Sequence, residues 1–193
     1  MEHLYIISGC NGAGKTTASN TILPKTLLVK EFVNADEIAR GLSPFNPGNV
    51  AIEAGRLMIK RINELLEANE TFSVETTLSS RSYLNLIRRA HAKGYMVHLL
   101  YFWLNDVELA KQRVAERVLG GGHGVEPDVI ERRYYAGLKN LFNIFMKEVD
   151  VWAIYDNSYN EIERVAFGGA KVSLEVNNAV KYNTIKEYDK KRN

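Results

Sequence analysis

Residues 9–16 carry the strongest chemical signal in this chain. Their sequence, Gly-Cys-Asn-Gly-Ala-Gly-Lys-Thr, matches the pattern G-x-x-x-x-G-K-[ST] at every fixed position. Glycines let consecutive backbone N–H groups converge on phosphate oxygens, and a helix beginning near Lys15 points its positive dipole end at the same anion. Lys15 should reach the β- and γ-phosphates, and the Thr16 hydroxyl is a ligand for Mg²⁺. The motif therefore predicts a nucleoside triphosphate site.

Cys10 occupies a variable position of this motif. A thiol at a helix N-terminus can have a lowered pKa and act as a redox sensor. A side chain at an unconstrained position is the simpler interpretation, and we expect no regulation through Cys10. Because it is the only cysteine, the chain forms no internal disulfide and no Cys-rich zinc site.

Two acidic residues follow or end expected strands. Asp36 comes after the strand expected over 27–33, and Glu75 lies near the end of the strand expected over 72–76. Parallel strands end at the same edge of a sheet, which places both carboxylates beside the phosphate loop. Asp36 could orient or deprotonate an acceptor hydroxyl, or cap the following helix, and the sequence favours neither. Glu75 could hold Mg²⁺ through water or bind a substrate hydroxyl, and Thr76 extends the polar cluster.

Four arginines flank a glycine-rich break at 120–124. Arg113 and Arg117 are four residues apart, hence on one face of a helix, and Arg132 and Arg133 lie beyond the break. This region, about 113–133, is typical of a helical lid that brings cations to a transferring phosphoryl group and excludes water. For His123, within the break, contact with phosphate and a turn-forming role are equally compatible with the sequence.

Strands and helices alternate through the first 155 residues. Apolar runs predict strands, and 3.6-residue periodicity with capping and breaking residues predicts helices. The expected strands span 4–7, 27–33, 72–76, 95–104 and 151–155, and the expected helices span 15–22, 36–40, 80–93, 106–119, 127–149 and a segment from 49 onwards. This order predicts an α/β, three-layer sandwich with a mainly parallel five-stranded sheet. Residues 162–167 could add an edge strand, and 178–193 could form a helix or a frayed tail.

Length and composition exclude several classes. The 193 residues are 46% hydrophobic, which suits one sizeable core, and we expect a single domain over 1–193. The formal net charge of +2 argues against nucleic acid as a partner, and no segment is apolar enough to span a membrane. The N-terminus has no signal-peptide pattern, so we expect a cytoplasmic protein. A motor would need added domains, and no Asn-Lys-x-Asp or ABC signature is present, which leaves small-molecule kinases.

In the order of these motifs, the chain resembles the zeta-toxin family of phosphate-loop kinases over residues 4–160. The resemblance rests on residues 9–17, on Asn-Ala-Asp-Glu-Ile-Ala at 34–39, on Glu-Thr-Thr-Leu-Ser at 75–79, on the segment 113–133 with its Gly-Gly-His, and on Tyr-Asp-Asn-Ser at 155–158. It implies a kinase-type sheet, ATP with Mg²⁺, and transfer of the γ-phosphoryl group to a sugar hydroxyl. UDP-N-acetylglucosamine is the acceptor in characterised members, and an antitoxin protein is the implied partner.

The resemblance also implies roles for individual residues. Asp36 would be the base, and Lys15, Arg113 and Arg117 would be catalytic cations. Glu75, Thr76, Arg132 and Arg133 would bind the acceptor, one of Arg117, Arg132 and Arg133 would join Arg113 as a lid cation, and Thr16 would bind the metal. The nucleotide would be held by Gly9, Asn11, Gly12, Ala13, Gly14, Lys15, Thr16, Thr17 and Asn157.

Overall fold

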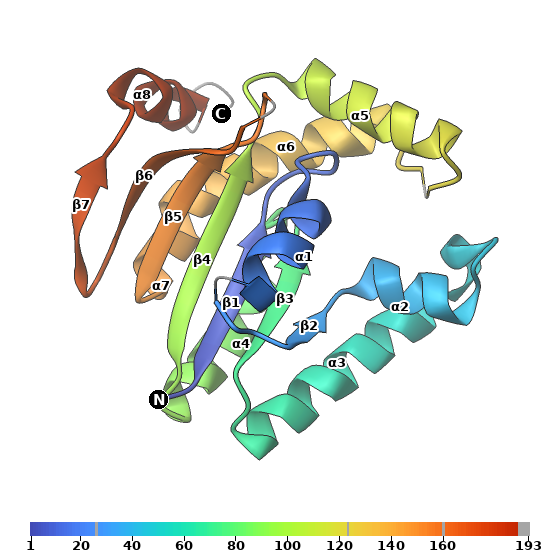
Figure 1. The fold of residues 1–193 in the computed structure, drawn as a ribbon, viewed down its shortest axis with the longest axis horizontal. Helices are drawn as coiled ribbons and strands as arrows, with labels where there is room; N and C mark the ends of the chain where they lie inside the picture. The colour runs from blue at the N-terminus through green and yellow to red at the C-terminus, as the bar shows by residue number, and fades with distance from the viewer. Residues whose placement is uncertain (26, 123, 160, 189–193) are drawn as a thin grey trace.

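Seven strands form one sheet in the order β2-β3-β1-β4-β5-β6-β7 (Figure 1). The computed structural model describes residues 1–25, 27–122, 124–159 and 161–188. The strands are β1 (His3–Ser8), β2 (Glu31–Val33), β3 (Phe72–Thr76), β4 (Met96–Trp103), β5 (Val151–Asp156), β6 (Glu163–Gly169) and β7 (Val172–Val176). The first five are parallel to one another, whereas β6 and β7 pair antiparallel.

The α/β prediction is confirmed, but the sheet has seven strands rather than five. The edge strand suggested for 162–167 is β6, and β7 was not predicted at all. Most of the β7 side chains are exposed, so neither a buried apolar run nor a marked alternation of burial announces this strand. It exists because it pairs with β6.

Helices cover both faces of the sheet. In Figure 1, α1 lies in front of β1 and β3, while α4, α6 and α7 lie behind the sheet. The helices are α1 (Lys15–Lys25), α2 (Ala35–Leu42), α3 (Ala51–Ala68), α4 (Tyr83–Ala92), α5 (Val107–Leu119), α6 (Pro127–Asn140), α7 (Met146–Glu148) and α8 (Ala179–Tyr188), with a 3₁₀ turn η1 (Pro47–Val50) and a π turn η2 (Leu141–Phe145). The lid segment predicted at 113–133 therefore spans the second half of α5, its connection and the start of α6.

Several predicted boundaries were wrong. Helix α1 continues through Pro24 to Lys25, because a proline near a helix end removes only one terminal hydrogen bond. The strand expected over 27–33 is reduced to Glu31–Val33, and Leu28 before it has a left-handed backbone with φ of 55°. Ser80 does not start α4; its hydroxyl bonds to that of Ser82, directly before Tyr83.

The central strands form the core. Strand β4 lies between β1 and β5 and pairs parallel with both. Its apolar run is typical of a strand buried on both faces, but only residues 101–103 are buried without interruption, whereas Met96, His98 and Leu100 are partly exposed. Completely buried side chains from the central strands include Leu4, Ile6, Phe72, Val74, Val97 and Leu99. No helix among the described residues has both the length and the apolar character that a bilayer crossing requires.

Strand register brings the predicted polar positions to one edge. Ile7 of β1 pairs with Glu75 of β3, and Val33 of β2 pairs with Val74 of the same strand. The phosphate loop after β1, the turn after β2 and the end of β3 therefore meet at the carboxyl edge of the sheet.

Candidate functional site

The phosphate loop turns from β1 into α1. Gly9 has φ of 140°, and a Cβ atom there would collide with the Phe102 carbonyl of β4. Gly14 has φ of 75°, and a Cβ atom there would collide with the Asn157 amide. Both positions need glycine for the left-handed backbone and for the close approach of neighbouring segments. Ala13 and Asn11 of the same loop are buried.

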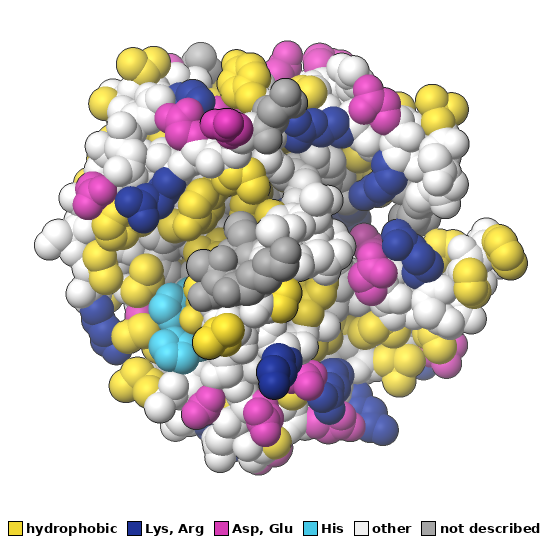
Figure 2. Space-filling view, viewed as in Figure 1, with side chains coloured by type: hydrophobic (Ala, Val, Ile, Leu, Met, Phe, Trp, Pro, Cys, Tyr) yellow, Lys and Arg dark blue, Asp and Glu magenta, His cyan; other side chains and the backbone are white. Residues whose placement is uncertain are grey.

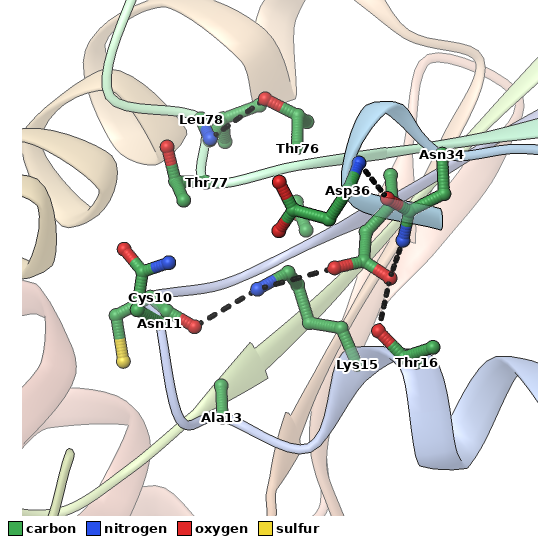
Figure 3. Close-up of polar contacts among 12 residues, drawn as sticks. Cys10, Asn11, Ala13, Lys15, Thr16, Asn34, Asp36, Thr76, Thr77 and Leu78 are labelled. Carbon is green, nitrogen blue, oxygen red and sulfur yellow. Dashed lines mark hydrogen bonds and ion pairs between the residues drawn. The ribbon is translucent and has the colours of Figure 1, made fainter. Parts of the chain in front are cut away.

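Lys15 and Thr16 lie at the start of α1 and contact the end of β3 (Figure 3). Lys15 Nζ donates to Cys10 O at 2.9 Å and lies 3.6 Å from Glu75 Oε1. The Thr16 hydroxyl donates to Glu75 Oε2 at 2.7 Å. Glu75 is thus a near neighbour of the two side chains expected to bind phosphate and metal.

Asn34 connects this carboxylate to helix α2. Its Oδ1 accepts from the backbone N–H groups of Asp36 and Glu37 at 2.8 and 3.3 Å, and its Nδ2 donates to Glu75 Oε2 at 2.9 Å. The N-cap of α2 is therefore Asn34 and not Asp36. The site predictions did not include Asn34, although an asparagine before Ala-Asp-Glu is a recognisable capping signal.

Because Asn34 caps α2, the Asp36 carboxylate does not serve as the helix cap. Its carboxylate lies between the phosphate loop and the Thr76–Leu78 segment (Figure 3). Within the described part of the chain, this carboxylate makes no hydrogen bond or ion pair. A buried neighbour, Lys15, lines the same cleft, so Asp36 is placed where an acceptor group could meet a bound phosphate.

The cleft above the phosphate loop has a volume of about 370 Å³ and is mostly polar. It is lined by Asn11, Gly12, Gly14, Lys15, Thr16, Thr17, Asp36, Glu37, Arg40, Glu75, Arg113 and Arg117. A hollow of about 190 Å³ adjoins it and adds Asn34, Ala35, Thr76, Thr77 and Arg133. Most predicted site residues therefore face one connected space.

The four arginines predicted to belong to a lid have different positions. Arg117 lines the cleft, and Arg133 Nη1 donates to Asn11 Oδ1 at 3.1 Å on the other side of the loop. Arg113 also lines the cleft, but its guanidinium donates to the carbonyls of Asn157 and Ser158 at 2.8 and 3.1 Å. Arg132 is exposed and lines a separate hollow with Asp128, Tyr135 and Lys139, so the structure does not bring it to the phosphate loop.

Asn157 contacts the phosphate loop directly. Its Nδ2 donates to Ala13 O at 2.8 Å, which places the amide against the loop backbone. Thr76, at the end of β3, accepts from Leu78 N at 3.0 Å and so shapes the turn after this strand. His123 lies outside the described residues.

Oxygen ligands dominate the position predicted for the metal. The Thr16 hydroxyl and the Glu75 carboxylate are adjacent, and both are hard donors of the kind that Mg²⁺ prefers. Magnesium bound with a nucleotide takes one or two protein oxygens and completes its octahedron with phosphate and water oxygens. The donor set present fits this ion.

Cys10 is not suited to redox sensing. The residue is only 2% exposed, and burial raises the pKa of its thiol to about 11, despite the opposing positive charges of Lys15 and Arg113. The thiolate, which is the reactive form, is therefore disfavoured at neutral pH.

Sequence comparison connects this arrangement to a known family. The model of the family described as Zeta toxin matches residues 2–162. The chain belongs to the zeta toxin family. An uncharacterised protein of Haemophilus influenzae is 33% identical over 126 residues, which cover 65% of this chain and 88% of that protein.

Solved structures show the same fold at low sequence identity. A chain of the AvrRxo1-ORF1:AvrRxo1-ORF2 complex with sulphate ions aligns with a TM-score of 0.77 and 19% identity over 96% of this chain. This chain spans only 63% of that longer chain. A chain from the PezAT toxin–antitoxin system of Streptococcus pneumoniae aligns with a TM-score of 0.66 and 14% identity, covering 98% and 85% of the two chains. A shikimate kinase from Bacteroides thetaiotaomicron has a TM-score of 0.51 and 16% identity over 83% of this chain and 89% of its own.

The zeta toxin match includes every residue that lines the cleft, as well as Asn157 against the phosphate loop, and ends before β6. Family membership and the complete phosphate-binding motif together support a nucleotide-dependent, kinase-like activity. Helix α8 lies beyond the matched residues.

Proposed function

We propose that this protein is an ATP- and Mg²⁺-dependent kinase that transfers the γ-phosphoryl group to a hydroxyl of a small acceptor. A sugar hydroxyl is the expected nucleophile, and UDP-N-acetylglucosamine is the first candidate acceptor. The observation that carries the proposal is the Asp36 carboxylate, which has no bonding partner among the described residues and lines the same cleft as Lys15 and Thr16. Its capping role belongs to Asn34, so Asp36 is available for chemistry.

The phosphate loop would hold the triphosphate of ATP. Backbone N–H groups of the loop and the N-terminus of α1 suit the phosphate oxygens, and Lys15 Nζ would exchange its contact with Cys10 O for the β- and γ-phosphates. Thr16 and Glu75 would hold Mg²⁺, with Glu75 acting directly or through water. The bound ion supplies neutralisation of charge on the transferring phosphoryl group.

Asp36 would position the acceptor hydroxyl and take its proton. A kinase of this kind needs an acidic group near the nucleophile, because in-line transfer depends on orientation more than on covalent chemistry. The adjoining hollow, with Thr76, Thr77 and Arg133, offers hydroxyl and guanidinium groups for a hydroxylated or phosphorylated acceptor. Arg117 would add positive charge from the lid.

A protein partner of the antitoxin kind is part of the proposal. The PezAT structure is described as a toxin–antitoxin system, and the AvrRxo1 structures contain ORF1 together with ORF2. One AvrRxo1 structure is described as containing ATP, which supports the same ligand for this fold. A partner that covers the cleft would inhibit the reaction by blocking nucleotide access.

An acceptor screen with γ-labelled ATP tests the proposal. We expect label transfer and ADP release that depend on an added acceptor, beginning with UDP-N-acetylglucosamine. Lys15→Ala should abolish nucleotide binding or turnover, whereas Asp36→Asn should keep ATP binding and lose transfer. Asp128→Asn, on the far hollow, is the control and should behave as wild type.

Three results would contradict the proposal in different ways. Normal transfer by Asp36→Asn would remove Asp36 as the base. Tight ATP binding without ADP release under any condition would indicate a nucleotide-binding module. Label on short 5′-hydroxyl oligonucleotides would indicate a nucleic-acid kinase, which the surface does not favour: basic and acidic side chains are interspersed over the described residues in the face shown in Figure 2.

A further inference from the structure

Helix α8 follows β7 in the chain and lies outside the residues that the family model matches. It nevertheless lies near the carboxyl edge of the sheet, where the phosphate loop begins. Figure 1 shows it near the end of β5 and the start of β6. The helix packs against β6 and α6, with Ile185 completely buried. Its polar residues therefore lie close to the segment that follows β5.

The ammonium group of Lys181, on α8, forms ion pairs with two carboxylates. Its Nζ lies 2.5 Å from Asp156 Oδ2 and 2.6 Å from Glu163 Oε2. Asp156 is only 1% exposed, and no other group in the described chain is bonded to its Oδ2. Burial alone would raise the pKa of Asp156, but the bonds from Lys181 and Ser158 lower it below its ordinary value. A buried carboxylate in this position depends on its lysine, because an unpaired buried charge is costly.

The other oxygen of Asp156 fixes the segment after β5. Asp156 Oδ1 accepts from Ser158 N at 2.8 Å and also contacts Ser158 Oγ. The Ser158 hydroxyl oxygen in turn accepts from Asn105 N at 2.8 Å. Asp156 thus sets the backbone of the two residues that follow it.

Asn157 sits between these two anchor points and faces the phosphate loop. Its side-chain amide donates to Ala13 O at 2.8 Å, and the Gly14 backbone approaches so closely that a Cβ atom there would overlap this amide. Arg113 donates to the carbonyl oxygens of Asn157 and Ser158, which holds the segment from the α5 side. A displacement of the 156–158 segment would therefore have to move the phosphate loop.

We propose that Lys181 is a positioning residue for the phosphate loop: its ammonium group pairs with Asp156, and Asp156 orients the segment from which Asn157 supports Ala13 and Gly14. Helix α8 then contributes to the nucleotide site by holding the phosphate loop in position. For its effect on ATP the inference rests on the proposed function, but the support of the loop itself does not depend on which ligand is bound.

Hydrogen exchange in the nucleotide-free protein tests the support directly. We expect Lys181→Met to speed exchange of the amides in residues 9–16 by about tenfold or more, because the 156–158 segment no longer holds the loop in place. Lys186 lies on the same helix but is exposed, and within the described residues the ion pair of Asp156 is made by Lys181, so Lys186→Met should leave these amides unchanged. Lys181→Arg should restore most of the protection, since it keeps a cation beside Asp156.

ATP binding provides the second measurement. Lys181→Met should weaken ATP about tenfold at temperatures well below its thermal unfolding, with kcat at saturating ATP changed much less than KM. Asp156→Asn combined with Lys181→Met should recover part of the affinity, because no buried charge is left unpaired. This double variant also keeps the test valid if Lys181→Met alone folds poorly.

The outcomes separate the two proposals. If the folded Lys181→Met protein shows wild-type exchange in residues 9–16, the positioning role is wrong. Where Lys181→Met does not fold, the double variant takes its place: it lacks the ion pair and should recover only part of the protection, so exchange equal to wild type would also show that the ion pair does not hold the loop. If exchange rises as expected but wild-type protein does not bind ATP, the positioning role stands and the proposed function fails. If exchange and ATP affinity change together, both are supported.

Discussion

Asn34 Nδ2 and Glu75 Oε2 are joined by a hydrogen bond of 2.9 Å, and the Oδ1 atom of the same asparagine caps helix α2. One side chain therefore couples the helix that carries Asp36 to the carboxylate that accepts the Thr16 hydroxyl. The relative placement of the expected base and the expected metal ligand depends on this asparagine.

Replacing Asn34 with alanine should destabilise the protein and disturb the site. Loss of an N-cap oxygen costs about 1 kcal/mol of unfolding free energy, and Glu75 also loses a donor. Urea unfolding measures the effect. Asn46→Ala is the matched control, because Asn46 precedes η1 without a side-chain capping bond and should change stability by less than about 0.5 kcal/mol. Equal losses in the two variants would show that the cap is unimportant.

Arg132 and Arg133 are adjacent in the sequence, but we expect only Arg133 to contribute to the activity. Arg133 bonds to Asn11 in the phosphate loop, whereas Arg132 lines the separate hollow. Because successive residues of a helix point about 100° apart, only one can face the cleft. Arg133→Gln should lower kcat/KM by about tenfold or more, and Arg132→Gln should leave it nearly unchanged. Steady-state kinetics with the identified acceptor decides the matter; a larger effect at Arg132 would mean that α6 turns on nucleotide binding.

Gly137 and Gly55 give a second matched pair. A Cβ atom at Gly137 would lie 2.7 Å from Thr77 O and 3.2 Å from the Tyr101 hydroxyl, so Gly137→Ala should destabilise the protein by about 1–3 kcal/mol. At Gly55 such an atom would meet nothing within 4 Å outside its own helix among the described residues, and Gly55→Ala should stabilise α3 by about 0.5–1 kcal/mol. Thermal and urea unfolding should therefore shift in opposite directions. A neutral Gly137→Ala would show that α6 can move away from β3.

His98 makes stability depend on pH in a defined range. Burial lowers the pKa of His98 to about 4, with a smaller effect of His3, whose Nδ1 lies 2.8 Å from His98 Nε2. The unfolded chain binds this proton near pH 6.5, so the contribution of neutral His98 is complete above pH 6.5 and is lost as the pH falls towards 4. His98→Gln should reduce the slope of unfolding free energy in this window by up to about 1.4 kcal/mol per pH unit.

A separate group acts below that window. Burial opposes ionisation of Asp150, but bonds from Val97 N, Lys171 and His91 prevail and lower its pKa to about 2. Its stabilising effect is therefore lost between about pH 4 and pH 2, after His98 has already titrated. For His98, the contradicting result would be a His98→Gln protein whose unfolding free energy depends on pH between 6.5 and 4 as steeply as that of the wild type.

The sequence alone determined the local chemistry and the fold class. The glycines, Lys15 and Thr16 form a motif whose function resides in consecutive backbone groups, so no distant contact is needed to recognise it. The alternation of apolar strands with amphipathic helices likewise indicates an α/β sheet, because burial patterns repeat along a single segment. The expected lid and the strand-end carboxylates followed from the same local rules.

Tertiary structure decided what each of these groups contacts. Whether Asp36 or Asn34 caps α2 depends on backbone geometry, and the pairing of Asn34 with Glu75 depends on strand register between β2 and β3. Strand β7 and the ion pair between Lys181 and Asp156 join segments whose own sequences carry little signal, since their energy arises only when the partner is present. The local sequence pattern identifies side chains that could take part in a reaction. Long-range packing decides which of them, such as Asp36, face the cleft and which, such as Asn34, hold other groups in place.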